Sequence, residues 1–126
     1  MSRKTRILYI DDEPDIRLIV EMALKMRPEM EVRTADSGEA GLAMLRWSDW
    51  MADIVMVDVM MPGLTGPDVL AALRADPRFG KVPVIFVTAR ARPQDIRDYI
   101  EQGAKGVITK PFDPISLAGQ VLALID

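Results

Sequence analysis

The chain has 126 residues, of which 49% are hydrophobic and 28% charged, and its net charge is −3. A chain of this length fits one domain and can fold without disulfide or metal staples. It contains no cysteine and no histidine, which excludes thiol nucleophiles, Ser-His-Asp catalysis and zinc sites built on thiolate or imidazole. The acidic balance argues against direct nucleic acid binding. No apolar stretch approaches the ~18 residues of a membrane span, so we expect a cytoplasmic protein without membrane insertion.

Short apolar runs alternate with amphipathic segments in the first half of the chain. A β-prone run over residues 7–10 ends at two aspartates, and apolar residues then recur at helical spacing over 14–27. Residues 31–35 alternate between polar and apolar, which is typical of a strand at or near a sheet edge. Ser37 can cap the helix predicted over residues 38–47.

The second half of the chain continues this alternation. Its first apolar run is unbroken, which is typical of a strand covered on both faces. The predicted strands and helices alternate over residues 54–57, 67–75, 82–87, 93–103, 106–109 and 116–125. Five strands that alternate with five helices indicate an α/β fold, a parallel sheet with helices on both faces. We find no repeat or linker, and we expect a single domain over residues 1–126.

Polar residues end four of the five predicted strands. The first strand ends in Asp11 and Asp12, the third in Asp58, the fourth in Thr88 and the fifth in Lys110. In open α/β sheets, ligands bind at the carboxyl ends of the strands. Two unit charges 4 Å apart repel by about 4 kcal/mol at an effective dielectric constant of about 20, so these carboxylates need raised pKa values or a cation. Lys110 offsets one charge, and Mg²⁺ suits the remainder.

Each of these residues also has an ordinary structural interpretation. Asp11 and Asp12 could cap the first helix, and Asp58 could be a turn residue before the loop rich in Pro and Gly. Thr88 and Lys110 could simply end their strands. Their joint placement on one rim of the sheet is what favours a functional site.

The chain resembles the receiver domains of bacterial two-component response regulators over nearly its whole length. The resemblance rests on four motifs in this order: ILYIDDE at 7–13, DVMMPGLTG at 58–66, VTA at 87–89 and TKPF at 109–112. It implies a flavodoxin-like (βα)5 three-layer sandwich with a parallel five-stranded sheet of order 2-1-3-4-5. The first and third strands would then be neighbours, which would bring their aspartates together.

The resemblance also implies a role for each rim residue. Asp58 would be the phosphoacceptor, Thr88 would hydrogen-bond a phosphoryl oxygen, and Lys110 would pair with another. The ligands of a bound Mg²⁺ would be two carboxylates, one backbone carbonyl and one carboxylate that acts mainly through bound water, namely Asp12, Asp58, Met60 and Asp11.

The implied function is that of a phospho-accepting receiver and not of an enzyme. The phosphoryl group would come from a phosphohistidine of a sensor histidine kinase or histidine phosphotransferase, or from a small phosphodonor. Because the chain has no histidine, the donor must be another molecule. Phosphorylation would switch a downstream protein partner or output domain through the fourth helix, fifth strand and fifth helix. The resemblance also allows a homodimer that forms on phosphorylation.

Three positions modify this expectation. The family usually has an aromatic switch residue three positions before the lysine, and here that position is Val107. Two further positions tune the lifetime of the phosphorylated state in the family, and the resemblance places Met60 and Arg90 there. An apolar Met60 beside the acyl phosphate would hinder attacking water, which predicts slow dephosphorylation.

Other function classes fit less well. A haloacid-dehalogenase-type phosphatase needs a second aspartate two residues after the first, where this chain has Glu13, and it needs room for a cap. A flavodoxin-type FMN site would need a Ser/Thr/Gly loop after the first strand, and an Asp-Asp-Glu loop repels phosphate. The remaining alternative is a receiver-fold scaffold that works without phosphorylation, although such members typically lose an acidic residue or the lysine.

Overall fold

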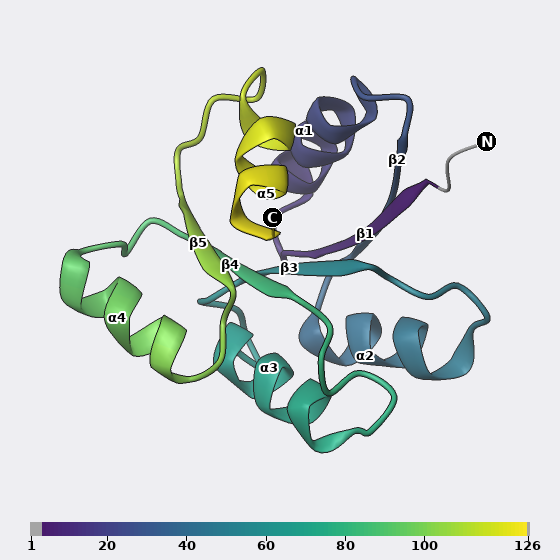
Figure 1. The fold of residues 1–126 in the computed structure, drawn as a ribbon, viewed down its shortest axis with the longest axis vertical. Coiled ribbons are helices and arrows are strands. Elements are labelled where there is room, and N and C mark those ends of the chain that lie inside the picture. Colours follow the sequence, from purple (N-terminus) through teal and green to yellow (C-terminus); the bar gives the residue numbers. More distant parts are fainter. Residues whose placement is uncertain (1–3, 126) are drawn as a thin grey trace.

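Five strands and five helices alternate along the computed structural model (Figure 1), which describes residues 4–125. Residues 1–3 and 126 of the predicted domain lie outside this description. The elements are β1 (Thr5–Ile10), α1 (Pro14–Lys25), β2 (Met30–Ala35), α2 (Gly38–Trp47), β3 (Ile54–Asp58), α3 (Gly66–Ala75), β4 (Val84–Thr88), α4 (Pro93–Glu101), β5 (Gly106–Thr109) and α5 (Leu117–Ile125). Every element predicted from the sequence is present, with ends that differ by no more than two residues.

All strands of the sheet are parallel, and their order is β2-β1-β3-β4-β5. This confirms the expected order, and it places β2 at an edge, as its alternating pattern indicated. β1 lies between β2 and β3, so that Ile10 pairs with Ala35 on one side and with Val57 on the other. The residues that follow β1 and β3 are therefore direct neighbours.

The helices form one layer on each face of the sheet. Figure 1 shows α1 and α5 on one face and α2, α3 and α4 on the other. Side chains alternate between the two faces because a strand has a period of two residues. In β1, Ile7 and Tyr9 pack in the α1/α5 layer, whereas Leu8 and Ile10 pack in the other layer. β3 is buried throughout, which explains its unbroken apolar run.

Two local features fix where helices begin. The Ser37 side chain accepts a hydrogen bond from the Ala40 backbone N–H at 3.0 Å, as predicted for a cap of α2. At α3, Thr65 and Asp68 form a reciprocal capping box. Among residues 4–125, no helix is long and apolar enough to cross a membrane.

Candidate functional site

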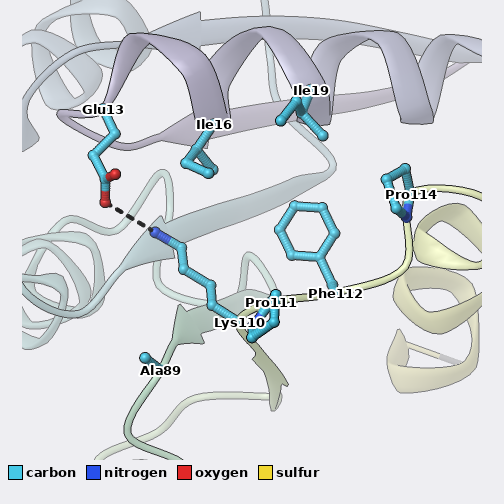
Figure 2. Close-up of a pocket in the computed structure, with 8 residues that line it drawn as sticks. All are labelled: Glu13, Ile16, Ile19, Ala89, Lys110, Pro111, Phe112 and Pro114. Carbon is cyan, nitrogen blue, oxygen red and sulfur yellow. Dashed lines mark ion pairs between the residues drawn. The ribbon is translucent and has the colours of Figure 1, made fainter.

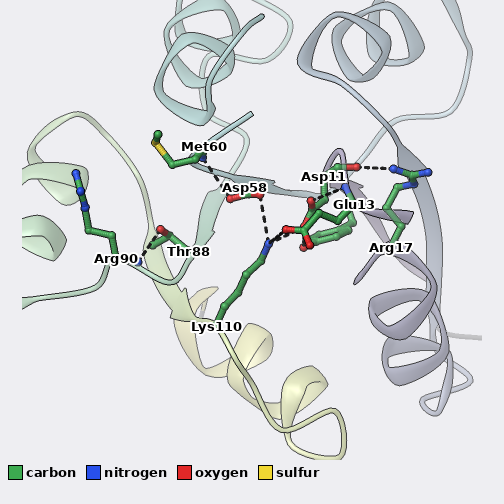
Figure 3. Close-up of polar contacts among 9 residues, drawn as sticks. Asp11, Glu13, Arg17, Asp58, Met60, Thr88, Arg90 and Lys110 are labelled. Carbon is green, nitrogen blue, oxygen red and sulfur yellow. Dashed lines mark hydrogen bonds and ion pairs between the residues drawn. The ribbon is translucent and has the colours of Figure 1, made fainter. Parts of the chain in front are cut away.

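The carboxyl ends of β1, β3, β4 and β5 bring the predicted rim residues together. Asp11, Asp58 and Thr88 are the buried polar side chains at this edge, with exposed fractions of 0%, 6% and 2%. Figure 3 shows Lys110 reaching from the end of β5 toward Asp58 and Asp11. The alternate spacing that buries Met56 in the α1/α5 layer also directs Asp58 to that side.

Lys110 is shared between the buried carboxylates. Its Nζ lies 2.8 Å from Asp11 Oδ2 and 3.2 Å from Asp58 Oδ2. A third carboxylate oxygen, Glu13 Oε1, lies 3.8 Å away. One ammonium group therefore serves two buried carboxylates and one exposed one, and the rim keeps an excess of negative charge.

The electrostatic surroundings shift the pKa values of Asp58 and Lys110. Burial raises the pKa of Asp58; the Lys110 charge opposes this, the Asp11 charge adds to it, and the net shift is upward. Burial by itself would lower the pKa of Lys110, but the hydrogen bond and charge of Asp11 and the charge of Asp58 outweigh it, so that this pKa is raised. Lys110 is therefore a stable positive charge, whereas ionisation of Asp58 is disfavoured when no further cation is present.

Asp11 is held from several directions, and two of these contacts were not predicted. The Tyr9 hydroxyl donates to Asp11 Oδ2 at 2.6 Å, and the Arg17 guanidinium donates to the Asp11 backbone carbonyl at 2.8 Å. Asp11 Oδ1 accepts the backbone N–H of Glu13 at 3.0 Å, and α1 begins without a side-chain cap. The signal for Tyr9 was its position two residues before Asp11, on the same side of the strand. Burial and the bond to Asp11 raise the pKa of Tyr9 far above its usual range.

Three carboxylates at the rim could hold a metal ion. Asp11, Asp12 and Asp58 each offer one oxygen, and these oxygens lie within 4.8 Å of one another. Oxygen donors of this kind fit a hard cation such as Mg²⁺. Asp12 is exposed, so its carboxylate is accessible from solvent. The Met60 backbone N–H donates to Asp58 Oδ1 at 3.3 Å, which places Met60 beside the acceptor; the role of its carbonyl as a ligand stays a prediction.

An open cleft leads to Asp58. It has a volume of about 220 Å³ and is lined by Glu13, Asp58, Met60, Thr88, Ala89, Arg90 and Lys110. Thr88 Oγ1 accepts the backbone N–H of Arg90 at 3.0 Å, which ties the end of β4 to the loop before α4. Met60 is 68% exposed, so its apolar side chain stands at the mouth of the cleft.

A second, more apolar pocket adjoins this cleft. It has a volume of about 310 Å³ and lies between α1 and the segment that follows β5. Figure 2 shows Ile16 and Ile19 of α1 on one side, and Phe112 and Pro114 on the other. Lys110 lines both the pocket and the cleft, so the apolar groove ends directly beside the acidic rim.

The loop between β3 and α3 returns to the place where it leaves the sheet. The Gly66 backbone N–H donates to the Val59 carbonyl at 3.0 Å. A Cβ on Gly66 would lie 2.8 Å from the Asp58 carbonyl oxygen, closer than real Cβ contacts. Only glycine therefore allows α3 to begin against the strand that carries Asp58.

The fold and the rim define an open α/β domain with an acidic, lysine-paired site at the carboxyl ends of its strands. The family described as "Response regulator receiver domain" matches residues 7–122. The chain belongs to this family, and it is a receiver domain of two-component systems. The resemblance given by the four motifs is thereby confirmed.

Individual relatives agree with this assignment. The chain is 34% identical to the chemotaxis protein CheY-3 of Vibrio cholerae over 117 residues, which cover 93% of this chain and 88% of the relative. It is 36% identical to the chemotaxis protein CheY of Pseudomonas aeruginosa, with 85% of each chain covered. The solved structure of the chemotaxis response regulator CheY4 of Vibrio cholerae superposes with a TM-score of 0.86 at 28% identity, covering 96% of this chain and 98% of that one.

Proposed function

We propose that Asp58 accepts a phosphoryl group in a two-component phosphorelay. The observation that carries this proposal is the position of Asp58: it is buried at an open cleft, and its Oδ2 lies 3.2 Å from the Lys110 ammonium. A carboxylate is a poor nucleophile toward an anionic phosphoryl group, so the transfer depends on positioning and charge neutralisation. The rim supplies a fixed positive charge and a set of oxygen ligands for a second one.

The proposed step forms one bond and breaks one. An Asp58 oxygen bonds to phosphorus while the bond from phosphorus to the donor's leaving atom breaks, and the leaving group keeps the electron pair. Lys110 Nζ pairs with one phosphoryl oxygen, and the Thr88 hydroxyl donates to another. The chain accepts the group and assists its later removal by water; in this proposal it turns over no separate substrate and is not an enzyme in that sense.

The donor set at the rim supports a Mg²⁺ requirement. The proposed ligands are Asp12, Asp58, the Met60 carbonyl and, mainly through water, Asp11. The ion would supply positive charge against the phosphoryl oxygens. Its binding would also offset the repulsion among the three carboxylates, which Lys110 balances only in part.

The proposed donor is a sensor histidine kinase or a histidine phosphotransferase, with small phosphodonors as substitutes. The chain has no histidine, so the phosphoryl group comes from another molecule. The apolar groove between α1 and residues 112–114 ends beside Lys110, which gives a donor protein a surface next to Asp58. The proposal includes a cytoplasmic location. It also includes no direct contact with nucleic acid, which the net charge of −3 supports because nucleic acid binding needs a basic surface.

The proposed output is a change in the face formed by α4, β5 and α5, read by a downstream protein, an output domain or a second copy of the chain. Thr88 supports this route because its Oγ1 holds the backbone of Arg90, in the loop that leads into α4. Val107 packs partly buried against the core, so this face lacks the usual β5 aromatic. The nearby Tyr99 is buried and packs edge-to-face on Phe86, with ring centroids 5.2 Å apart.

The decisive experiment is phosphorylation by acetyl phosphate in the presence of Mg²⁺, followed by mass spectrometry of the intact chain. We expect one phosphoryl addition, which Asp58→Asn abolishes and chelation of Mg²⁺ prevents. Asp49→Asn is a matched control, because Asp49 is exposed and lies in the connection from α2 to β3, which enters the sheet at the edge opposite the rim. Absence of any addition with a panel of donors would instead favour the phosphorylation-independent scaffold.

The output route has its own test. Backbone amide resonances of the phosphorylated chain should shift in α4, β5 and α5, and Thr88→Ala should remove these shifts while Asp58 is still phosphorylated. Shifts confined to the cleft would contradict the proposed output face and leave the phosphoacceptor role intact.

A further inference from the structure

Tyr9 joins the hydrophobic core to the acidic rim. It has no exposed surface and belongs to the hydrophobic cluster of the α1/α5 layer, together with Val20 and Leu24. Tyr9 and Asp11 are two residues apart at the end of β1, so their side chains leave the backbone on the same side. A buried tyrosine hydroxyl needs a hydrogen-bond partner, and here the partner is Asp11 Oδ2 at 2.6 Å.

Three donors fix the Asp11 carboxylate: two lie two residues before and after it, and the third follows β5. The Tyr9 hydroxyl and Lys110 Nζ lie 2.6 Å and 2.8 Å from Oδ2, and the Glu13 backbone N–H lies 3.0 Å from Oδ1. Lys110 is divided between Asp11 and Asp58, whereas the Tyr9 hydroxyl is directed at Asp11. Of the two contacts to Asp11 Oδ2, the one from Lys110 is therefore shared with Asp58 and the one from Tyr9 is not.

We propose that Tyr9 is a positioning residue for the metal site, whose hydroxyl fixes the orientation of the Asp11 carboxylate before Mg²⁺ binds. This inference rests on the proposed function, in which Asp11 contributes to the Mg²⁺ site. A ligand that is already oriented loses little conformational freedom when the ion binds, and groups that orient metal ligands raise affinity for that reason. Without the hydroxyl, the oxygen it holds keeps only Lys110, which Asp58 also attracts.

The first test compares two tyrosine variants. The chain has only two tyrosines, Tyr9 and Tyr99, and both are buried. Tyr9→Phe should raise the dissociation constant for Mg²⁺, measured by calorimetry without any phosphodonor, by about ten-fold. Tyr99→Phe removes the hydroxyl of the other buried tyrosine, which lies outside the set of possible metal ligands, and should leave this constant unchanged.

The second readout separates positioning from a loss of folded protein. In reactions with acetyl phosphate, Tyr9→Phe should raise the Mg²⁺ concentration for half-maximal rate by a similar factor and leave the rate at saturating Mg²⁺ close to that of the wild type. A merely structural role would lower stability without changing the Mg²⁺ concentration for half-maximal rate. In an Asp11→Asn background, Tyr9→Phe should cause no further change in Mg²⁺ affinity.

A third measurement needs no substitution, so it remains valid if Tyr9→Phe fails to fold. In protein labelled with ¹³C at the tyrosine Cζ, the Tyr9 resonance should move on titration with Mg²⁺, and the Tyr99 resonance should stay nearly still. An unmoved Tyr9 resonance, or equal Mg²⁺ affinity in folded Tyr9→Phe and wild type, overturns the inference. Failure of the wild type to become phosphorylated at Asp58 is a different result, and it overturns the proposed function.

Discussion

The two sides of the acidic cleft differ in how completely their polar groups are bonded. On the side of β1 and β5, Asp11 is fully buried and meets Tyr9, Lys110 and the Glu13 backbone. On the opposite side, Met60 is 68% exposed. The loop between β3 and α3, which carries Met60, contacts the Asp58 carboxylate through the Met60 backbone N–H. The first side is assembled before any ligand arrives, whereas the second is left open to solvent and ligand.

This difference separates stability from reactivity. Substitutions on the bonded side break buried charge pairs, so they should change the free energy of unfolding and metal binding together. Substitutions on the open side break no buried contact, so they should change phosphorylation and dephosphorylation rates with little effect on stability. Asp58 lies between the two sides and should respond to both.

Removal of the shared cation should give the largest effect. Lys110→Met leaves Asp11 and Asp58 buried without their ammonium partner, and we expect a loss of about 2–3 kcal/mol in the free energy of unfolding at pH 7 without Mg²⁺. Urea titrations measure this loss, and added Mg²⁺ should recover part of it. Lys105→Met is the control, since Lys105 is exposed. A loss below about 0.5 kcal/mol, the size of ordinary surface effects, would show that the buried charge pairs on the side of β1 and β5 do not control stability.

The open side should control the lifetime of the phosphorylated state. Met60→Asn replaces the apolar side chain at the mouth of the cleft with one that can hydrogen-bond water, and dephosphorylation should become about ten-fold faster, equivalent to ~1.4 kcal/mol of barrier. Decay is followed by mass spectrometry after removal of the donor. Met22→Asn, at a methionine of similar exposure on α1, should decay like the wild type. A wild-type half-life of seconds in Mg²⁺ would show that Met60 gives no protection.

Neutralising the acceptor should stabilise the fold when no Mg²⁺ is present. Because the pKa of Asp58 is raised in the folded chain, the folded state binds this proton at higher pH than the unfolded state, and the charged form costs stability at pH 7. Asp58→Asn should therefore raise the free energy of unfolding by about 1 kcal/mol at pH 7. The difference should shrink as the pH falls and vanish below the unfolded pKa of about 3.9. Thermal unfolding across this pH range measures it, and a difference that grows toward low pH would have the wrong sign.

The smallest expected effect concerns Arg90 at the open edge of the cleft. Its exposed charge can attract an anionic phosphodonor, so Arg90→Ala should slow the reaction with acetyl phosphate about two-fold at low ionic strength. At high salt the difference should disappear through screening. Stability should be unchanged in both conditions. An effect that is independent of salt would show that Arg90 acts by contact and not by its field.

Most of the fold could be predicted because its strands are locally distinct. β3 and β4 are short apolar runs with polar residues at their carboxyl ends, and a parallel sheet brings those ends to one edge. The strand order could not be predicted in this way, because alternating apolar runs indicate a parallel sheet but do not say which strands are neighbours. That order came from the resemblance to receiver domains, and the pairing of β1 with both β2 and β3 confirms it.

The contacts around Asp11 could not be predicted as easily. Tyr9 belongs to an apolar run that is buried on both faces, so burial alone does not distinguish it from an ordinary core residue; the one signal is its position two residues before Asp11. Arg17 lies six residues from Asp11, and its bond to that backbone carbonyl depends on the angle at which α1 leaves the sheet. The Arg17 contact is therefore set by the packing of α1 on the sheet, which short-range sequence patterns do not encode.

The loop that carries Met60 is closed at its base, since the Gly66 N–H is bonded to the Val59 carbonyl at 3.0 Å. Its two ends meet at one point on the sheet, so residues 60–65 form a cassette whose replacement does not alter the distance that the flanking chain must span. Loops exchanged between receiver domains at this junction should therefore transfer their kinetic character as a unit. The loop that sets the lifetime of the phosphorylated state can in this sense be exchanged, whereas the acidic site beside it is built into the core.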